Sequence, residues 1–339
     1  MDATQRFAVV MNNKARKVKA HTIEMVSRHV PDEDLFVTQT FEQSDACLQE
    51  IIEKRYPLVF CGGGDGTAMR IIEQLLRHVK RLRQSGREAA MPRIGLLKLG
   101  TGNGWAGQLK VPPKTDPIDR LKRGAPSRFT RFSMLQVGDR LAHMGGLGID
   151  AAVLNDYIAL KNRHHAGWRW KFANSMWGYI YAIAFVSIPH FMRHGSTWNV
   201  RVYNDSDEQV YQAAIGEQPT RLGLRRGDLL YEGPLRFVGF ATTMNYGFDL
   251  KVFPFAATMP AGYMQLRLVS TSIPGLLARV PQVWTGTIRH AGVRDYLLTR
   301  VRVESDDDVP FQLGGDPEGT VRSVTVGVAA ETVEVLDFS

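Results

Sequence analysis

The chain has 339 residues, enough for two domains that each bury their own core. Its 44% hydrophobic and 22% charged residues are ordinary for a folded protein and exclude a disordered chain. A net charge of +8 favours anionic partners, such as nucleotides, nucleic acid or an acidic membrane surface, without choosing among them.

The cysteines and the start of the chain indicate a compartment. Cys47 and Cys61 are too few for a disulfide framework. The chain does not open with a charged start followed by an apolar run and a small-residue cleavage site. We therefore expect a cytoplasmic protein with reduced cysteines.

Two segments bear on contact with membranes. Residues 77–87 carry five Arg or Lys among eleven residues, which is typical of a solvated helix face, with a membrane or nucleic-acid patch as the alternative. Residues 172–191 form the longest apolar stretch, close to the roughly 20 residues needed to cross a bilayer. Because Asn174 interrupts this stretch and Pro189 closes it, we expect a buried or interfacial helix.

In the first part of the chain, predicted strands alternate with predicted helices. Strands are expected at residues 7–11, 34–40, 56–61 and 93–100. Helices are expected at residues 15–29, 44–55 (capped by Ser44 or Asp45) and 67–83. This alternation predicts a parallel α/β sheet over at least residues 6–110.

The pattern changes after residues 111–117, which break the alternation. A short helix is expected at 118–122, helices at 173–188 and 274–284, and strands at 129–138, 197–204, 209–216, 235–243, 263–270, 295–305 and 323–330. We therefore expect an α/β domain at residues 1–135, a β-rich sandwich domain at 136–325, and a C-terminal segment, 326–339, that returns to the first domain.

The segment "CGGGDGT", residues 61–67, lies between a predicted strand and a predicted helix. Ligands bind beyond the carboxyl ends of such strands, helix N-terminal amides attract phosphate, and glycines let a backbone approach it. Asp65 adds a negative charge, which suits a phosphate site that also binds magnesium or activates an attacking hydroxyl. The alternative is a tight turn in which Thr67 caps the helix.

Other nucleotide motifs do not fit this segment. It lacks the Lys-Ser/Thr ending of a P-loop, and Thr67 stands where G-x-G-x-x-G needs its third glycine. A second loop, Gly100, Thr101, Gly102 and Asn103, follows the next predicted strand and also opens a helix. Two such loops at successive strand ends predict a phosphate-binding cleft.

These motifs resemble those of the diacylglycerol kinase catalytic-domain superfamily, which includes sphingosine kinases, ceramide kinases and bacterial lipid kinases. "GGGDGT" and "LGTGN" are similar to its two glycine loops. Weaker similarity is carried by "VVMNNKA", "HMGGLGIDAAV", "WGYIYAIAFV" and "LGGDPEG". The resemblance touches the whole chain, although only the two loops are highly specific.

The resemblance implies ATP- and Mg²⁺-dependent phosphorylation of a lipid hydroxyl, in a cleft between an α/β domain of the NAD kinase and diacylglycerol kinase type and a β-sandwich domain. It implies that nucleotide contacts come from Asn12, Gly62, Gly63, Gly64, Gly66, Thr67, Gly100, Thr101, Gly102 and Asn103. Asp65, Asp316 and Glu318 would be the catalytic acids, and either Asp65 or Glu318 would be the general base. For residues 312–319, a polar hairpin turn explains the sequence about as well as catalysis does.

Three departures from the family pattern leave other functions open. Arg70 replaces a glutamate, Gly104 an aspartate and Pro317 a glycine. The alternatives are a kinase of a soluble acceptor such as NAD, because NAD kinases share the first loop, and a binding module without turnover.

The expected partners are a lipid substrate, a second copy of the chain and, by peripheral contact, the inner face of a membrane. A nucleic-acid partner is not expected, because it would explain the charge but not the loops. Trp168 and Trp170 alternate with Arg169 and Lys171, so this segment either touches a membrane interface or packs between domains.

Overall fold

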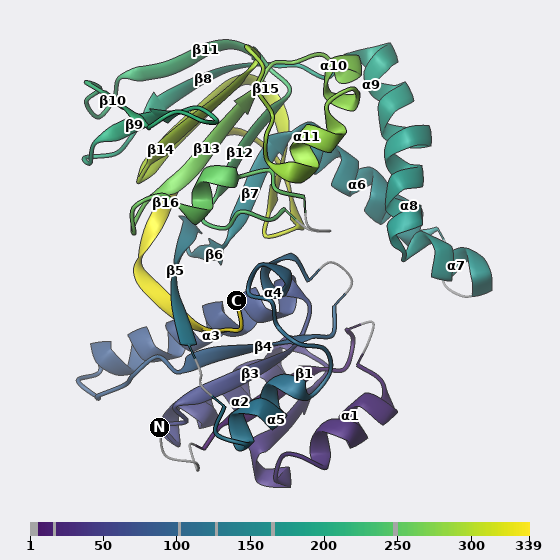
Figure 1. The fold of residues 1–339 in the computed structure, drawn as a ribbon, viewed down its shortest axis with the longest axis vertical. Coiled ribbons are helices and arrows are strands. Elements are labelled where there is room, and N and C mark those ends of the chain that lie inside the picture. The colour runs from purple at the N-terminus through teal and green to yellow at the C-terminus, as the bar shows by residue number, and fades with distance from the viewer. Residues whose placement is uncertain (1–5, 16–17, 101–102, 126–127, 164–166, 247–249) are drawn as a thin grey trace. The chain divides into compact units, whose positions relative to one another are not determined.

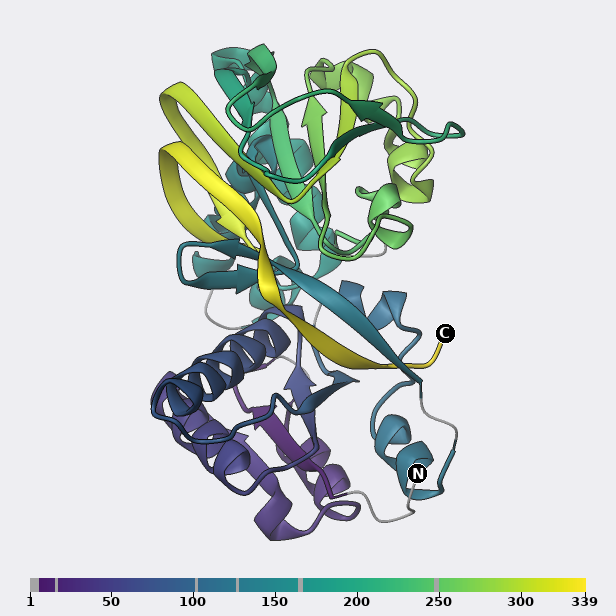
Figure 2. The same ribbon diagram turned by 90° about the vertical axis from the view of Figure 1, so that its left-hand side faces the viewer.

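The structure is a computed structural model that describes residues 6–15, 18–100, 103–125, 128–163, 167–246 and 250–339. The chain divides into two compact units, each described here by itself (Figures 1 and 2). Unit 1 contains residues 6–133 and Glu331–Ser339, and unit 2 contains Met134–Tyr246 and Leu250–Ala330.

Unit 1 is built on a parallel sheet with the strand order β4-β3-β1-β2. Its strands are β1 (Ala8–Asn12), β2 (Leu35–Thr38), β3 (Leu58–Gly63) and β4 (Arg93–Lys98). The end of β16 (Asp316–Asp337) adds a parallel neighbour to β4, with Val335 opposite Ile94. The apolar runs of β1, β3 and β4 are buried, as expected of parallel strands that are covered on both faces.

The helices of unit 1 are α1 (Ala20–Ser27), α2 (Phe41–Glu53), α3 (Asp65–Gln84), α4 (Gly104–Gln108) and α5 (Asp116–Lys122). The expected cap of α2 at Ser44 or Asp45 is wrong. The cap is Thr40, whose hydroxyl accepts a hydrogen bond from the Gln43 amide at 3.3 Å. The helix begins early because Thr40 is the first capping side chain after β2 ends.

Unit 2 is rich in antiparallel strands. They include the part of β5 (Arg128–Val137) from Met134 on, β6 (Arg140–Ala142), β7 (Met144–Gly148), β8 (Trp198–Asn204), β9 (Val210–Ala213), β10 (Thr220–Leu222), β11 (Leu229–Leu235), β12 (Phe237–Ala241), β13 (Met264–Val269), β14 (Val293–Leu298) and β15 (Arg300–Leu313). Seven of them follow the order β10-β9-β14-β13-β12-β7-β15. The strand expected at residues 295–305 is two strands, β14 and β15, with Thr299 between them.

The long strand β15 joins two parts of the unit 2 sheet. Before an irregularity between Glu304 and Val309 it pairs with β8, and after it β15 pairs with β7. A large apolar cluster, including Val202, Phe240 and Leu266, fills the core of the unit.

The helices of unit 2 are α6 (Ile149–Asn162), α7 (Gly167–Ala173), α8 (Met176–Tyr181), a π-helical segment (Ala182–Ser187), α9 (Ile188–His194), α10 (Ile273–Leu277) and α11 (Val280–Thr285). Helix α6 was not expected from the sequence. No helix in the described part of the chain is long and apolar enough to cross a membrane. The predicted fold class, an α/β N-terminal part with a parallel sheet followed by a β-rich part, is confirmed.

Candidate functional site

The two glycine loops of unit 1 touch each other through their backbones. A Cβ atom built on Gly100 would lie 2.2 Å from the Cα of Gly64, a distance no packed atoms tolerate. Gly64 precedes α3 and Gly100 follows β4. The two strand ends therefore lie together as the sequence predicts, and their close approach requires glycine at position 100, whereas a Cβ at position 64 would be tight, at 3.1 Å from the Gly100 Cα.

The other glycines of the first loop have different roles. Gly62 and Gly63 are the last residues of β3 and are buried. A Cβ on Gly63 would lie 2.5 Å from the Thr67 Cβ, so this glycine makes room for a side chain. A Cβ on Gly66 would meet nothing within 4 Å, so the first turn of α3 is open at Gly66.

The start of α3 is suited to an anion. Its cap residue, Gly64, has no side chain that could bond to the amides of the first turn. Those amides, at Asp65, Gly66 and Thr67, carry the positive end of the dipole of a 20-residue helix. Such a terminus binds phosphate groups readily.

Asp65 is the first residue of α3 and is partly buried. Its Oδ2 atom accepts a hydrogen bond of 2.7 Å from the Gly104 amide, at the start of α4. Gly104 is the position at which the family pattern has an aspartate, so this chain brings a backbone amide but no second carboxylate to Asp65 here.

A magnesium ion is compatible with Asp65. Mg²⁺ is typically bound by one or two carboxylates together with phosphate oxygens and water. The Oδ1 atom of Asp65 makes no hydrogen bond to another described residue, and the amides beside it suit phosphate. Within the described ranges, no group of three or more His, Cys, Asp or Glu side chains is placed to hold a metal by itself.

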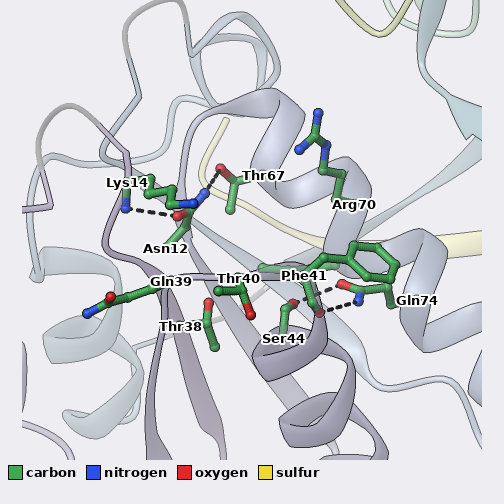
Figure 3. Close-up of a pocket in the computed structure, with 11 residues that line it drawn as sticks. Asn12, Lys14, Thr38, Gln39, Thr40, Phe41, Ser44, Thr67, Arg70 and Gln74 are labelled. Atoms are coloured by element: carbon green, nitrogen blue, oxygen red, sulfur yellow. Dashed lines mark hydrogen bonds between the residues drawn. The ribbon is translucent and has the colours of Figure 1, made fainter.

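Asn12 connects the end of β1 to α3. Its Oδ1 atom accepts a hydrogen bond from the Lys14 amide at 2.9 Å, and its Nδ2 atom donates to the Thr67 hydroxyl at 3.4 Å (Figure 3). Thr67 is the third residue of α3, so it does not cap the helix. Its hydroxyl instead connects the first turn of α3 to Asn12.

Asn103 closes the second loop. It has left-handed backbone angles, φ 44° and ψ 39°, which asparagine tolerates better than most residues. Its side-chain amide accepts a hydrogen bond from the Gly100 amide (3.0 Å) and donates one to the Gly100 carbonyl (2.8 Å). Thr101 and Gly102 lie outside the described residues.

A cavity of about 160 Å³ opens beside Asn12 and Thr67 (Figure 3). It lies at the ends of β1 and β2 and the starts of α2 and α3, and its lining residues are Asn12, Lys14, Thr38, Gln39, Thr40, Phe41, Ser44, Thr67, Arg70, Ile71 and Gln74. Two of them are cationic and none is acidic. The sequence analysis missed the contribution of β2, although its polar ending, "TQT", was a signal of it.

Asp316 and Glu318 belong to unit 2, where they start β16 directly after a hairpin turn. Gly314 and Gly315 form that turn with φ of 63° and 84°, the left-handed angles of a type I′ hairpin. Glu318 accepts a hydrogen bond from Arg140 Nη1 at 2.8 Å. The hairpin interpretation of this segment therefore agrees with the geometry.

A carboxylate that the sequence analysis did not select, Asp150, lies in the first turn of α6. Its Oδ2 atom accepts hydrogen bonds from the Tyr246 hydroxyl and, at 3.1 Å, from Gln312 Nε2. Its Oδ1 atom is enclosed and has no hydrogen-bond partner among the described residues. The signal was present in "GLGIDAAV", which resembles the family segment at the start of the second domain.

Burial changes the titration of this cluster. It raises the pKa of the Asp150 carboxyl, and the hydrogen bonds from Tyr246 and Gln312 act in the opposite direction. Burial, followed by the negative charge of Asp150, raises the pKa of Tyr246 well above its usual value. Tyr246 therefore stays a hydrogen-bond donor to Asp150 at every pH near neutrality.

Asp150 and Tyr246 line a cavity of about 270 Å³ in unit 2. The rest of the lining is almost entirely apolar and includes Val153, Ile183 and Leu276. Arg267 also contributes, but its charge is neutralised by Asp295 through two hydrogen bonds of 2.7 and 2.9 Å. The volume is near the lower end of the range of small-molecule sites, roughly 300–1,000 Å³.

Comparisons with known proteins agree with these features. Residues 6–137 match the family model of the diacylglycerol kinase catalytic domain. Two solved structures from Bacillus anthracis str. Sterne, described as candidate diacylglycerol kinases, have TM-scores of 0.66 and 0.64 at 14% and 13% identity. Both align with 98% of this chain, and the chain covers 95% and 97% of theirs. No curated protein matches the sequence.

At this level of identity the structures show a common fold, whereas the family match concerns the residues that carry both glycine loops. The resemblance predicted from "GGGDGT" and "LGTGN" is thereby confirmed: residues 6–137 match the model of the diacylglycerol kinase catalytic domain, which supports a kinase.

Proposed function

We propose that this protein is an ATP-dependent lipid kinase, which transfers the γ-phosphate of ATP to a lipid hydroxyl. The family match supports the kinase class. The observation that favours a lipid as acceptor is the cavity of unit 2, whose lining is almost wholly apolar apart from Asp150, Tyr246 and the neutralised Arg267. A soluble, charged acceptor such as NAD would find few partners there.

In this proposal the nucleotide binds to unit 1. The open amides at Gly66 and Thr67 hold phosphate oxygens, and Lys14 and Arg70 supply positive charge at the neighbouring cavity. When bound, Mg²⁺ would neutralise charge on the transferred phosphoryl group, and Asp65 would hold it, since its Oδ1 atom makes no hydrogen bond to another described residue.

Asp65 is also the better candidate for the group that orients the acceptor hydroxyl. Its Oδ1 atom makes no hydrogen bond to another described residue and has two lone pairs, so it can meet the ion and also accept from the acceptor hydroxyl, whereas Glu318 is engaged by Arg140. Phosphoryl transfer passes through a loose transition state, so positioning matters more than a strong base. The acyl part of the lipid lies in the apolar cavity, and Asp150 accepts a hydrogen bond from its polar part.

The test is transfer of labelled γ-phosphate from ATP, with magnesium, to diacylglycerol, monoacylglycerol, sphingosine, ceramide and NAD. We expect label in an organic-extractable product, and a loss of at least about a thousandfold in Asp65→Asn with ATP binding retained. Glu318→Gln, the matched variant, is expected to keep most of the activity. Label only in NAD would identify a soluble-acceptor kinase, and ATP binding without transfer would identify a binding module; either result rejects the proposal.

The acceptor cavity has a separate test. Val153→Phe places a larger side chain on α6 in the lining, so we expect the KM for long-chain acceptors to rise about tenfold, with less effect on short-chain acceptors. Asn155→Phe adds the same group at an exposed position of the same helix and serves as the control. Equal effects of the two variants on KM would argue against the cavity as the acyl site.

A further inference from the structure

Helices α7 to α9 and the π-helical segment between them expose many large apolar side chains. Four of these side chains are 65% or more exposed: Trp168 (73%), Trp177 (65%), Phe185 (69%) and Met192 (72%). Four more on the same segment are at least 38% exposed: Trp170, Phe172, Ile180 and Tyr181. We call these eight side chains the aromatic face. A folded protein rarely leaves so many large apolar groups together in water.

The aromatic face follows the helical repeat. Trp177, Tyr181 and Phe185 are spaced four residues apart, so they lie along one side of the helical segment. The opposite side is buried at Ala182, Ser187 and Phe191. From α8 onward the exposure is therefore a property of one side of the helical segment, whereas Trp168, Trp170 and Phe172 lie on the separate helix α7.

The buried side is anchored to α6. The Ser187 hydroxyl donates a hydrogen bond of 2.7 Å to Asp156 Oδ2, and the rings of Tyr157 and Tyr179 pack edge to face with centroids 5.1 Å apart. In Figure 1, α6 lies between the strands of unit 2 and the helices α8 and α9. The anchored segment thus presents its aromatic face outward from unit 2.

The charge within helices α7 to α9 has one sign, and the carboxylate of Asp156 contacts only their buried side, at Ser187. Residues 157–204 contain no Asp or Glu. Five cations lie within or beside the helices: Lys161, Arg163, Arg169, Lys171 and Arg193. None of the five forms a salt bridge with another residue that the structure describes. The segment combines apolar groups with uncompensated positive charge.

We propose that the aromatic face docks on the surface of an anionic lipid bilayer. Tryptophan and tyrosine are the side chains that prefer the interface between headgroups and acyl chains, and the flanking cations attract anionic headgroups. A second copy of this chain is a poorer occupant, because a symmetric dimer through this face would oppose two clusters of the same charge.

Docking does not depend on the proposed transfer reaction and is measured without nucleotide. The purified full chain is sedimented with vesicles of phosphatidylcholine and phosphatidylglycerol in equal parts, and with vesicles of phosphatidylcholine alone. We expect binding to the anionic vesicles, weaker binding to the neutral ones, and weakening by salt. A lack of binding to anionic vesicles would overturn the inference, whatever the kinase assay shows.

Two pairs of variants separate the apolar and charged contributions. Trp177→Ser with Phe185→Ser is expected to weaken vesicle binding at least about tenfold, and Leu229→Ser, at an exposed apolar residue of β11, is its control. Lys171→Gln with Arg193→Gln is expected to weaken binding roughly 30-fold. Its control, Lys80→Gln with Arg87→Gln, removes the same charge from the basic run of α3 and the turn after it.

The variants also distinguish docking on a bilayer from docking on a second copy of the chain. Unchanged binding in the Trp177 and Phe185 variant, or a larger loss in the Lys80 and Arg87 control, would place the membrane contact elsewhere and reject the aromatic face. Gel filtration of the same proteins gives the other result that would overturn the proposal: a wild-type dimer that the Trp177 and Phe185 variant converts to a monomer, without vesicle binding.

Discussion

Two carboxylates at the starts of helices have opposite environments. Asp65 is anchored at one oxygen by the Gly104 amide and keeps the other for a ligand, in a setting of open helix amides. Asp150 is surrounded by apolar side chains and by two donors, Tyr246 and Gln312. The same residue type at the same place in a helix therefore lies in a polar setting of helix amides in one unit and in an apolar cavity in the other.

The raised pKa of Asp150 predicts a pH dependence of stability. A carboxyl with a higher pKa in the folded than in the unfolded state contributes most at acid pH, and its contribution is lost as the pH rises through the folded pKa. We therefore expect the free energy of unfolding of Asp150→Asn to improve relative to wild type as the pH rises from about 4 towards 8.

Urea denaturation at several pH values measures this difference. Asp139→Asn, at an exposed carboxylate of the same unit, is the control and is expected to follow the wild type. If the free energy of unfolding of Asp150→Asn changes with pH as that of the wild type does, the pKa of the Asp150 carboxyl is not raised in the folded protein.

At the scale of elements, the glycines of the two loops differ in what surrounds them. Gly64 and Gly100 bring two strand ends into backbone contact, whereas Gly66 leaves the first turn of α3 open. Asn12 and Asn103 then hold the two loops in place through side-chain hydrogen bonds. The proposed phosphate site is thus an assembly of β1, β3, β4, α3 and α4.

Because Gly100 contacts the other loop and Gly66 is open, we predict different outcomes for two alanine substitutions. Gly100→Ala would collide with the Gly64 backbone, and we expect it to lower the free energy of unfolding by about 1–3 kcal/mol. Gly66→Ala has room, so we expect unchanged or slightly higher stability, with weaker ATP binding because a methyl group stands beside the phosphate amides.

Urea denaturation and calorimetric titration with ATP measure the two effects. A Gly66→Ala protein that binds ATP as well as the wild type would show that this amide is not a phosphate contact. A Gly100→Ala protein of unchanged stability would show that the loops separate at no cost.

At the scale of the whole molecule, residues from the two ends of the sequence build unit 1. The last strand residues, Val333, Val335 and Leu336, are buried, and Val335 pairs with Ile94 of β4. Hydrogen bonds join Asp337 to Thr130 (2.5 Å) and the Phe338 amide to the Leu109 carbonyl (3.0 Å). The α/β unit is therefore completed by residues 331–339, which are far in sequence from its other strands.

We predict that Leu336→Ala lowers the free energy of unfolding by about 2–5 kcal/mol, because it empties a filled position of the unit 1 core. Thr332→Ala, at an exposed position of the same strand, is expected to change stability by less than about 0.5 kcal/mol. Urea denaturation gives the free energies, and hydrogen exchange locates the loss. Faster exchange confined to unit 2 would contradict the assignment of this segment.

Local patterns in the sequence determined the fold class and the position of the phosphate loops. Strand, glycine loop and helix are contiguous in the chain, so their hydrophobic period and glycines could be recognised without the rest of the molecule. The alternation in the first 110 residues predicted the parallel sheet for the same reason. The cap of α2 and the helix α6 were missed, since neighbouring capping residues and a weakly amphipathic segment give ambiguous local signals.

Only the tertiary structure decided which residues meet across long separations. Asp150, Tyr246 and Gln312 come from three distant segments, and no local pattern marks them as one cluster. The sequence also did not decide whether Trp177 and Phe185 are exposed. An apolar helix face has the same residue pattern whether another element or a membrane covers it. Local periodicity specifies elements, whereas burial and proximity depend on how the chain brings those elements together.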